Sequence, residues 1–527
     1  MSIYQSRFGE LVWSLWCLET AFISVGLILF ILLFVLEKRS PRVAHAHVHG
    51  YRSIFEPPFF LQTRFVLGAC EIIRDGYEKF KNVPFIVRRF DADYSVLPMR
   101  YLEEIRLIPM TKLSGKESQI RNMMPKWTGL EFMVRSHLHV DVLKRKLTPE
   151  LGRYLEAARS ELEYGWEVDV PRPDDWLEVD IQQITRMLIA RMSAKVFLGH
   201  PACRDLDWLQ TSVQYSIDTF TTAFILRMFP PFLHFIVAQF LPSKWRMRAQ
   251  LRTAERTVRP LMEKHAEATR RRSLGEEVEE QEDTLMKWML ENGTEQETRL
   301  SEMAARQCVL TLASIHTTAT IVANVIFELC ARLEWVPVLR DEFDRVTREV
   351  GQPGSDPNID MRRWHPRLEK LDSFIVETFR YYPPILLGPQ RLALEDITLK
   401  DGTKIPTGAK IAFAMYHHQN DAAVTPGPGL FDPMRSYRKR QSSAEEYARY
   451  QATLPDVNNN LSFGYGNQAC PGRFFAIAEI KLVISRLLNE FDFRLPEGQC
   501  RPKIMYADEN TFIDPNARIM MRKRRIA

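Results

Sequence analysis

The sequence predicts a mostly helical α+β protein, built as a single large domain with small β-sheets and preceded by one transmembrane helix. Three observations support this prediction. Residues 11–36 form an apolar run, long segments with helical spacing fill most of residues 60–527, and short alternating segments interrupt them. The chain therefore divides into an N-terminus (1–10), an anchor (11–36), a linker (37–59) and one domain (60–527).

The composition is that of a globular protein. Of the 527 residues, 45% are hydrophobic and 26% are charged, which excludes the disordered and fibrous classes. The net charge of +5 is small and no basic stripe interleaved with aromatic residues occurs, so nucleic-acid binding is not supported. The seven cysteines form no close pair, which argues against a disulfide framework and favours a reducing compartment.

The apolar run at residues 11–36 contains one charged residue, Glu19, and the basic segment EKRSPR follows it. As a helix it spans roughly 39 Å, more than a hydrocarbon core of about 30 Å. A cleaved signal peptide is the alternative, but the run is too long and its positive charges follow it. Because these charges favour the cytosolic side, we expect a single-pass protein of the endoplasmic reticulum membrane with residues 1–10 in the lumen and the domain in the cytosol.

The linker contains the motif HAHVH. In an extended segment His45, His47 and His49 project to one side, a spacing that can chelate a divalent metal. The alternative is a solvated juxtamembrane segment that leads to Pro57 and Pro58 at the entry of the domain. The sequence leaves both interpretations open.

Within the domain, the local pattern indicates several elements. Apolar residues three and four positions apart predict helices at 60–80 and 147–166. Alternating segments predict strands at 85–98 and 396–413, the second with a hairpin turn at Asp401-Gly402. Strands that interrupt helices in this way are typical of a mixed, helix-rich fold.

The segment 301–335 contains neither proline nor glycine and predicts a helix roughly 50 Å long. A second membrane span is the alternative, but seven of the twenty residues from Cys308 to Phe327 are polar, which is unfavourable in lipid. A buried central helix is therefore expected. Its polar groups need a partner, a water or a ligand, because burying each one unpaired costs about 1–3 kcal/mol.

The segment FGYGNQACPG, residues 463–472, holds one cysteine between glycines and a proline. Apolar spacing from residue 473 to 488 predicts a helix, with Pro471 in its first position, so Cys470 stands at a helix N-terminus. Unpaired N–H groups and the helix dipole favour a thiolate there. The flanking glycines allow a flat, wide group to approach the backbone; they are Gly464, Gly466 and Gly472.

Three alternatives explain this cysteine less completely. A zinc site needs further Cys or His at short spacing, and a phosphate-binding loop needs a different glycine spacing and a lysine. A nucleophilic cysteine needs a positioned histidine, which the sequence does not exclude, but it leaves Phe463 and the glycines unexplained. Thiolate ligation of a haem iron accounts for every feature.

The segment resembles the haem loop of the cytochrome P450 superfamily, and its ending ACPGRFFA is similar to fungal members. The pattern F-x-x-G-x-x-x-C-x-G is matched by Phe463, Gly466, Cys470 and Gly472. The resemblance covers roughly residues 60 to 515. It implies a haem monooxygenase domain that binds haem b through Cys470 as the axial thiolate and uses O2.

Further motifs of the family follow in the expected order. ETFR places Glu377 and Arg380 at i and i+3 on one helical face. The segment PGLFDPMRSY matches a second motif, whose arginine is Arg435. The resemblance implies that these three residues form a charge network that holds the haem loop in register, and a surface pair is the alternative for the first two.

The long helix carries ASIHTT, residues 313–318, at the position of the family's oxygen-activating motif. The resemblance implies that Thr317 faces the distal side of the iron and relays protons to oxygen. Ser314 replaces a glycine and His316 replaces an acid, a variant similar to ent-kaurene oxidase. Because a histidine titrates near 6.5, His316 either joins the proton path or hydrogen-bonds within the helices.

The resemblance also assigns residues to the haem propionates and the substrate pocket. Arg391 is the first cationic candidate, and Lys144 and Arg145 stand where the family has W-x-x-x-R, with Val140 in place of the tryptophan. Gln468 replaces the usual Arg or His. The implied pocket residues are Ala313, Thr317, Ile385, Leu386, Leu387 and Phe512.

The lining is mostly apolar, so we expect a hydrophobic natural-product intermediate from fungal secondary metabolism, a terpenoid first and a polyketide or alkaloid second. The aromatic run 220–240 either touches the bilayer or forms a plain core helix.

No flavin or dinucleotide fingerprint occurs, which implies a separate NADPH-dependent reductase. The basic residues 438–440 either help to dock this reductase or form a solvated loop. A haem-thiolate isomerase or dehydratase, and a non-enzymatic haem sensor, are the alternative functions.

Overall fold

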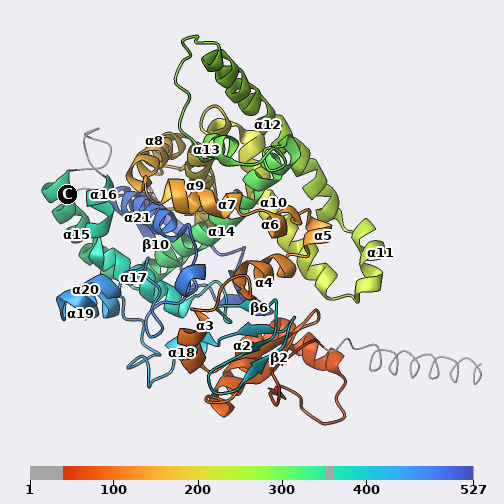
Figure 1. Cartoon of the computed structure of the whole chain (residues 1–527). Helices are drawn as coiled ribbons and strands as arrows, with labels where there is room; N and C mark the ends of the chain where they lie inside the picture. The colour runs from red at the N-terminus through yellow and green to blue at the C-terminus, as the bar shows by residue number, and fades with distance from the viewer. Residues whose placement is uncertain (1–39, 352–360, 526–527) are drawn as a thin grey trace, which may run out of the picture.

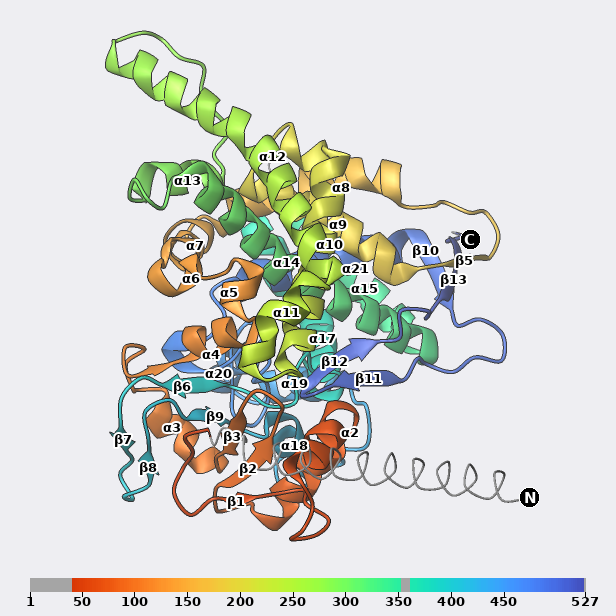
Figure 2. The same cartoon turned by 90° about the vertical axis from the view of Figure 1, so that its right-hand side faces the viewer.

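A computed structural model describes residues 40–351 and 361–525 (Figure 1). The expected membrane anchor, residues 11–36, and the N-terminus before it lie outside the described residues. The fold is mostly helical with small sheets, as the sequence predicts. The main sheet and α2 occupy one end of the molecule, and the long helices form the other (Figure 1, Figure 2).

The helical part is built around α14 (Leu300–Ala331), which packs against helices from many parts of the chain. The larger helices of the domain are α8 (Leu151–Asp169), α9 (Ile181–Phe197), α10 (Leu206–Arg227), α12 (Pro242–Ser273), α15 (Trp335–Val350), α17 (Glu369–Tyr381) and α21 (Arg473–Glu490). Shorter helices are α13 (Leu285–Asn292), α16 (Met361–Trp364), α18 (Met415–Gln419), α19 (Arg435–Arg440) and α20 (Ala444–Arg449). The expected central helix is therefore present.

Within the described residues, α14 alone is long and apolar enough to cross a membrane. In its most apolar window 67% of the residues are buried inside the protein. The helix packs against α9, α10, α12, α17 and α21. It is thus a core helix, as the polar residues along its middle predict.

The main sheet has six strands in the order β1-β2-β3-β9-β6-β4. Its members are β1 (His47–Val48), β2 (Phe85–Arg88), β3 (Asp93–Val96), β4 (Leu113–Ser114), β6 (Arg391–Ala393) and β9 (Lys410–Ala412), with α2 (Pro58–Lys79) packed beside β2. Strands β2 and β3 form the antiparallel pair predicted for 85–98. Strand β9 pairs with β3 in parallel and with β6 antiparallel.

Three smaller sheets complete the strands. They consist of β7 (Ile397–Thr398) with β8 (Lys404–Ile405), β10 (Phe491–Arg494) with β13 (Ile519–Lys523) and β5 (Leu177–Val179), and β11 (Ile504–Ala507) with β12 (Asn510–Ile513). The turn between β7 and β8 contains Gly402 at φ +87°. This left-handed conformation favours glycine, which explains the Asp401-Gly402 signal in the sequence.

The remaining helical segments are short and lie in the connections between the larger elements. They are η1 (Met99–Tyr101), α3 (Leu102–Ile105), α4 (Gly115–Asn122), α5 (Pro125–Thr128), α6 (Phe132–Arg135), α7 (Leu138–Val142), η2 (Leu143–Leu147), η3 (Ala202–Arg204), η4 (Pro231–Leu233), α11 (His234–Gln239), η5 (His365–Arg367) and η6 (Gly466–Gln468). Side chains cap several helices: Ser114 accepts from the Glu117 N–H at the start of α4, and Asp205 accepts from Asp207 and Trp208 at the start of α10. These caps fix where the helices begin.

One carboxyl group lies in the interface between α21 and α9. Glu479 is 0% exposed, and its nearest polar partner is the Ser193 hydroxyl, which donates to Oε1 at 3.4 Å. Its second oxygen has no hydrogen-bond partner among the described residues. Burial raises the pKa of Glu479 well above its ordinary value of 4.5. The folded protein therefore holds this group in its neutral form.

This burial predicts a pH-dependent gain in stability for Glu479→Gln. Above pH 4.5 the unfolded chain releases a proton that the folded chain retains, so the free energy of unfolding falls as pH rises toward the raised pKa. Glutamine does not titrate, so Glu479→Gln should increase the free energy of unfolding by about 1 kcal/mol or more at pH 7, and by less at pH 5. Urea unfolding at both pH values measures this, with the exposed Glu445→Gln as control. An equal effect at both pH values would contradict the explanation.

Candidate haem site

The segment around Cys470 forms a closed loop ahead of α21. The Cys470 N–H donates to the Phe463 carbonyl oxygen at 2.8 Å, which joins the two ends of the loop. Gly464 and Gly466 adopt φ values of +76° and +69°, a region that L side chains rarely occupy. A Cβ on Gly466 would also lie 2.8 Å from the Arg106 Cβ. Glycine is therefore required at position 466 for both conformation and space.

The helix after the cysteine starts later than the sequence predicts. α21 begins at Arg473 with Gly472 as its N-cap, and Pro471 lies in the turn before it, not in the first helical position. The net effect of the surroundings is a raised pKa for the Cys470 thiol, so the helix N-terminus alone does not produce the thiolate that the sequence suggests. Burial raises the pKa of the Cys470 thiol, while the N–H groups of Gly472 and Arg473 and the Arg473 guanidinium act to lower it.

Arg473 is a residue that the sequence analysis did not single out. Its guanidinium donates to the Cys470 carbonyl at 2.8 Å and to the Thr453 carbonyl at 2.9 Å. It thus fixes the backbone of the cysteine from the first turn of α21.

A Cβ on Gly472 would meet no atom within 4 Å. Space beside the cysteine is therefore open on this side.

Ala313 and Thr317 form an exposed strip one turn apart in the middle of α14, whose neighbouring positions are mostly buried. The Thr317 hydroxyl donates to the Ala313 carbonyl at 2.8 Å. This bond orients the hydroxyl oxygen on the exposed strip. The position agrees with the distal role expected for Thr317.

His316 is directed to a different partner. Its Nε2 lies 2.9 Å from the Val213 carbonyl oxygen on α10, and burial lowers its pKa. A neutral imidazole that donates to this carbonyl links α14 to α10. This geometry supports the alternative of a hydrogen bond between helices, and a role of His316 in the proton path stays a prediction.

Arg391 lies next to the cysteine loop, and no carboxylate of residues 40–351 or 361–525 pairs with it. Its guanidinium donates to the Gln390 carbonyl at 2.8 Å and to the Tyr465 carbonyl of the loop at 3.3 Å. The side chain is buried, its Nε has no hydrogen-bond partner among the described residues, and burial lowers its pKa to about 10. A buried cation in this state fits an anionic group such as a haem propionate.

The other propionate candidates lie in different settings. Lys144 and Arg145 on η2 are exposed, and their contact with a propionate stays a prediction. Gln468 holds the cysteine loop to the junction of β4 and α4: its Oε1 accepts from the Gly115 N–H at 2.7 Å, and its Nε2 donates to the Leu113 carbonyl at 2.9 Å. Arg391 is the candidate whose buried surroundings fit a propionate best.

The expected charge network is present as a set of contacts. Arg380 donates to Glu377 through Nη2 at 2.6 Å and Nε at 2.9 Å, and Arg435 Nε lies 3.4 Å from the same carboxylate. Glu377 and Arg380 are only 2% and 3% exposed, so a surface pair is excluded. The ring of the neighbouring Phe379 meets the Phe463 ring edge-to-face at 5.3 Å. The network-bearing helix α17 thus contacts the cysteine loop directly.

Comparison with known proteins decides the family. The family model described as Cytochrome P450 matches residues 148–521. The chain belongs to the cytochrome P450 family. It is 43% identical to Cytochrome P450 monooxygenase ATR4 of Stachybotrys chlorohalonatus, covering 92% of this chain and 91% of that protein. It is 37% identical to Ent-kaurene oxidase P450-4 of Gibberella fujikuroi, covering 90% and 92%.

Solved structures give the same fold. Retinoic acid bound cyanobacterial CYP120A1 superimposes with a TM-score of 0.66, covering 92% of this chain and all of that one at 16% identity. The chain is thus a cytochrome P450 monooxygenase, an oxidoreductase that incorporates oxygen. Members of the family bind haem through a cysteine thiolate and receive electrons from a reductase. The cysteine loop, the exposed strip of α14 and the buried Arg391 fit that cofactor.

Part of the predicted P450 pocket lining is buried elsewhere. Leu386 and Leu387 are 1% and 0% exposed and pack in the cluster with Phe65 and Ala414 beside the main sheet. They are therefore core residues and do not line an open pocket. Ile385 is half-buried and bridges to β12, where Phe512 is 48% exposed.

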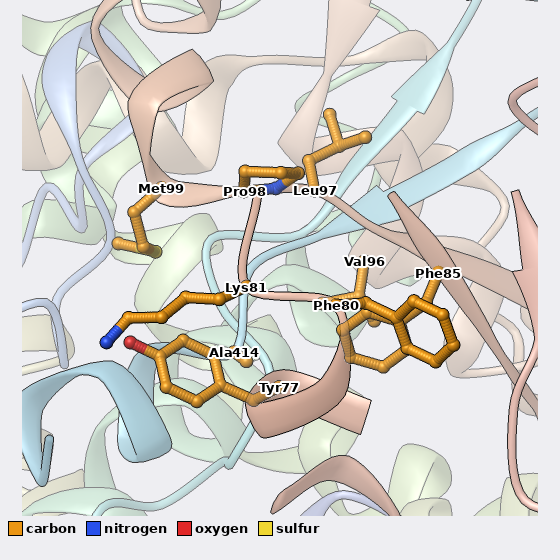
Figure 3. A pocket seen from close by; sticks show the side chains of 9 residues that line it. All are labelled: Tyr77, Phe80, Lys81, Phe85, Val96, Leu97, Pro98, Met99 and Ala414. Atoms are coloured by element: carbon orange, nitrogen blue, oxygen red, sulfur yellow. The ribbon is translucent and has the colours of Figure 1, made fainter. Parts of the chain in front are cut away.

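A small pocket lies apart from these P450 motifs, between the end of α2 and the main sheet (Figure 3). Its volume is about 10 Å³, the space of one water molecule. Figure 3 shows that its lining is mostly apolar, with the Lys81 ammonium group near the Tyr77 hydroxyl. It contains no residue of the predicted site and is too small for a substrate.

The histidines of the linker do not form a cluster in the structure. His49 pairs with Asp75 on α2 at 2.8 Å, and burial lowers its pKa. His47 lies in β1 and stacks on Phe80, whereas His45 adopts φ +62° and so departs from the extended conformation. The structure therefore favours the structural interpretation of this segment over a metal site.

Proposed function

We propose that this P450 inserts one oxygen atom of O2 into a C–H or C=C bond of a hydrophobic intermediate in a fungal secondary-metabolite pathway. A terpenoid is the first candidate, and a polyketide or alkaloid the second. An NADPH-dependent reductase supplies the electrons, and a single N-terminal span holds the domain on the cytosolic face of the endoplasmic reticulum. The observation that carries the proposal is the half-buried loop in which Cys470 lies directly before the N-terminus of α21.

In this proposal the bound haem supplies the activation of O2, and residues of the chain hold it in place. Cys470 would provide the thiolate ligand, and Gly472 leaves space beside it. Arg391 neutralises a propionate with a guanidinium that has no carboxylate partner in the structure. Phe463 packs against Phe379, and this contact holds the cysteine loop against α17.

Thr317 is the residue we assign to proton delivery. Its hydroxyl lies on the exposed strip of α14, fixed by its bond to the Ala313 carbonyl. Since His316 bonds the Val213 carbonyl on α10, the protons reach Thr317 from solvent or substrate and not from His316. Ala313 beside it leaves room for the substrate.

Replacing Thr317 by alanine should reduce product formation by about 10²-fold, the usual scale for losing an acid-base group. NADPH consumption should fall much less, because reduction of oxygen then ends in peroxide. Product, NADPH and hydrogen peroxide measured in one assay test this. Thr317→Ser should restore coupling, and His316→Gln should leave it nearly unchanged. A tightly coupled alanine variant would refute the assignment.

The preference for a terpenoid rests on similarity and on the character of the lining. A relative at 37% identity is named for the oxidation of ent-kaurene, and the exposed residues of the proposed site include the apolar Ala313 and Phe512. Moving the apolar surface of a substrate out of water is favourable by roughly 25 cal/mol per Å². A polyketide or alkaloid scaffold with similar apolar area is the second choice.

The function is tested with the full-length protein, its reductase, NADPH and a panel of terpenoids. Oxygenated product that depends on NADPH supports the proposal. Turnover without NADPH would instead indicate a haem-thiolate isomerase or dehydratase. Gas binding with no turnover on any substrate class would indicate a haem sensor.

Residues 228–240 of the run 220–240 are mostly exposed, which favours contact with the bilayer there, whereas residues 222–227 belong to α10 and are mostly buried. α11 and its flanks lie at the periphery of the molecule (Figure 1), and Phe232, Phe235 and Phe240 are 69%, 67% and 80% exposed. Aromatic side chains of this kind are favoured at membrane interfaces. The nearby Trp245 is 48% exposed and provides a probe.

We expect brominated lipids in vesicles to quench the fluorescence of Trp245. The Trp245 signal is the fluorescence of the full-length protein minus that of its Trp245→Phe variant, and it is compared in vesicles with and without bromine. The double change Phe235→Ser and Phe240→Ser should reduce that quenching at least twofold by removing buried apolar area. Phe59→Ser on α2 is a matched exposed-aromatic comparison. Quenching that is insensitive to both changes in α11 would contradict bilayer contact there.

The basic residues 438–440 are mostly used within the fold. Arg440 is buried and lies 3.6 Å from the Asp372 carboxylate, and Lys439 is half-buried over the ring of Tyr450. Arg438 is exposed and already pairs with Asp432. Their main role is thus structural, and the reductase surface is left unassigned.

A further inference from the structure

A group of metal-ligating side chains lies between α8 and the segment that joins α9 to α10. Glu161 comes from α8, and His200 and Cys203 come from the joining segment. One ligand atom of each lies within 4.8 Å of the other two. Among the described residues this is the group of His, Cys, Asp and Glu side chains close enough to hold an ion.

The distances approach those of a tetrahedral site. His200 Nδ1 lies 3.3 Å from Cys203 Sγ, and His200 Nε2 lies 4.0 Å from Glu161 Oε2. Zinc bonds of about 2.0 Å to nitrogen and 2.3 Å to sulfur at tetrahedral angles separate two such ligands by about 3.5 Å. His200 Nδ1 and Cys203 Sγ are thus already spaced for a common ion. The 4.0 Å contact of Glu161 runs to the other ring nitrogen, so the Glu161 carboxylate must turn toward Nδ1 from a position in which one ligand atom of each residue lies within 4.8 Å of the other two.

Burial gives the group an inner side and an outer side. Glu161 and Cys203 are 1% and 0% exposed, whereas the His200 side chain is 44% exposed. An ion can therefore enter past the histidine, and water can take the remaining position. A set of one nitrogen, one sulfur and one carboxylate oxygen suits zinc better than calcium or magnesium, which prefer oxygen alone.

Two basic residues near the group, Arg204 and Lys195, are paired with carboxylates. Arg204 Nε lies 3.2 and 3.3 Å from the two Glu161 oxygens, and its guanidinium stacks 3.7 Å from the centre of the Tyr164 ring. It orients the carboxylate in the way that outer partners orient metal ligands. Lys195 is paired with Glu282, whose carboxylate also accepts a hydrogen bond from the backbone N–H of His200 at 2.9 Å.

We propose that Glu161, His200 and Cys203 bind one zinc ion that cross-links α8 to the segment leading into α10, with water as the fourth ligand. Binding breaks the S–H bond of Cys203, forms a zinc–sulfur bond and releases the proton to solvent. No electron is transferred. The site is separate from the haem and does not depend on the proposed substrate.

The thiol chemistry gives the site a pH signature. Burial and the Glu161 charge raise the pKa of Cys203 to about 12. Zinc must displace this proton, so its affinity increases with pH. Because the ion binds the folded chain alone, it also increases resistance to unfolding with concentration.

The test uses the purified holoenzyme, freed of metal by a chelator and titrated with Zn²⁺ alone. We expect one zinc per chain after gel filtration, and an extended X-ray absorption fine structure at the zinc edge with one sulfur neighbour at about 2.3 Å. His200→Asn changes the exposed ligand, so the fold is retained, and should weaken zinc binding about tenfold or more. Cys203→Ala should remove the sulfur neighbour.

Two matched controls exclude other sites. Cys500→Ser changes an exposed cysteine, and His47→Asn changes a histidine of the linker; both should retain the zinc and its sulfur signal. An unchanged carbon monoxide spectrum confirms that the haem domain is intact in each variant. Zinc uptake that is unaffected by His200→Asn, a spectrum without sulfur, or failure to retain any zinc would overturn the proposal.

Discussion

Replacing Cys470 by serine should reduce oxygenation by about three orders of magnitude or more, which corresponds to roughly 4 kcal/mol in the reaction barrier. A serine hydroxyl does not ionise near neutral pH, so the iron loses the electron-donating thiolate that favours O–O cleavage. The reduced carbon monoxide difference band should move away from the thiolate position. Product formation with reductase and NADPH, together with this spectrum, measures both effects.

The serine variant should still fold. The loop is held by the Cys470 N–H bond to Phe463, by Arg473 and by Gln468, and none of these contacts uses the sulfur. Cys500→Ser, which changes an exposed thiol, is the matched control and should retain full activity. If the Cys470→Ser protein kept its pigment, its spectrum and its activity, the ligand would have to be another residue.

The features that sequence predicts well are those set by local spacing. Glu377 and Arg380 are three residues apart on one helix, so their pairing depends only on helical geometry. The β7–β8 turn depends on a single glycine at positive φ. The central helix follows from a long segment without proline or glycine. Each of these signals is contained within a few turns of the chain.

The features that sequence missed depend on neighbours distant along the chain. His316 bonds Val213 on another helix, and nothing near position 316 reveals that partner. Leu386 and Leu387 are apolar in a core and in a pocket alike, so their burial against α2 has no sequence signal. Lys144 and Arg145 match a motif position and are exposed on a π-helical turn, so their contact with a propionate stays a prediction.

A buried ionic cluster shows the same limit. The Arg89 guanidinium contacts Glu509 and Asp91, and Arg227 at the end of α10 lies 3.3 Å from Asp508 in the turn between β11 and β12. Burial raises the pKa of Asp508 to about 6. Partners separated by hundreds of residues assemble only in the fold. Neither the composition nor the spacing of these residues indicates the cluster.

Replacing Glu377 by glutamine should destabilise the folded protein by about 3–5 kcal/mol, the usual loss when one partner of a buried ion pair is removed. Glutamine keeps one acceptor oxygen, so Arg380, which is 3% exposed, would keep its bond to Oε1 but lose the negative charge and the bond from Nε to Oε2. The Oε1 that accepts from the Asp432 N–H at 2.9 Å would remain, whereas Arg435 would lose its 3.4 Å contact with Oε2 and face an NH2 donor instead. Urea unfolding and haem retention on a desalting column measure the effect.

The change should release haem as well as lower stability, because α17 contacts the cysteine loop through Phe379 and Phe463. The double variant Glu377→Gln/Arg380→Gln separates charge from packing: removing the uncompensated cation should recover part of the loss, so the two substitutions are not additive. Glu445→Gln on the exposed face of α20 should change stability by less than about 0.5 kcal/mol. Additive effects would mean that Glu377 acts independently of Arg380. A loss below about 1 kcal/mol would mean that the carboxylate is not needed to hold the segment around Asp432 and Arg435.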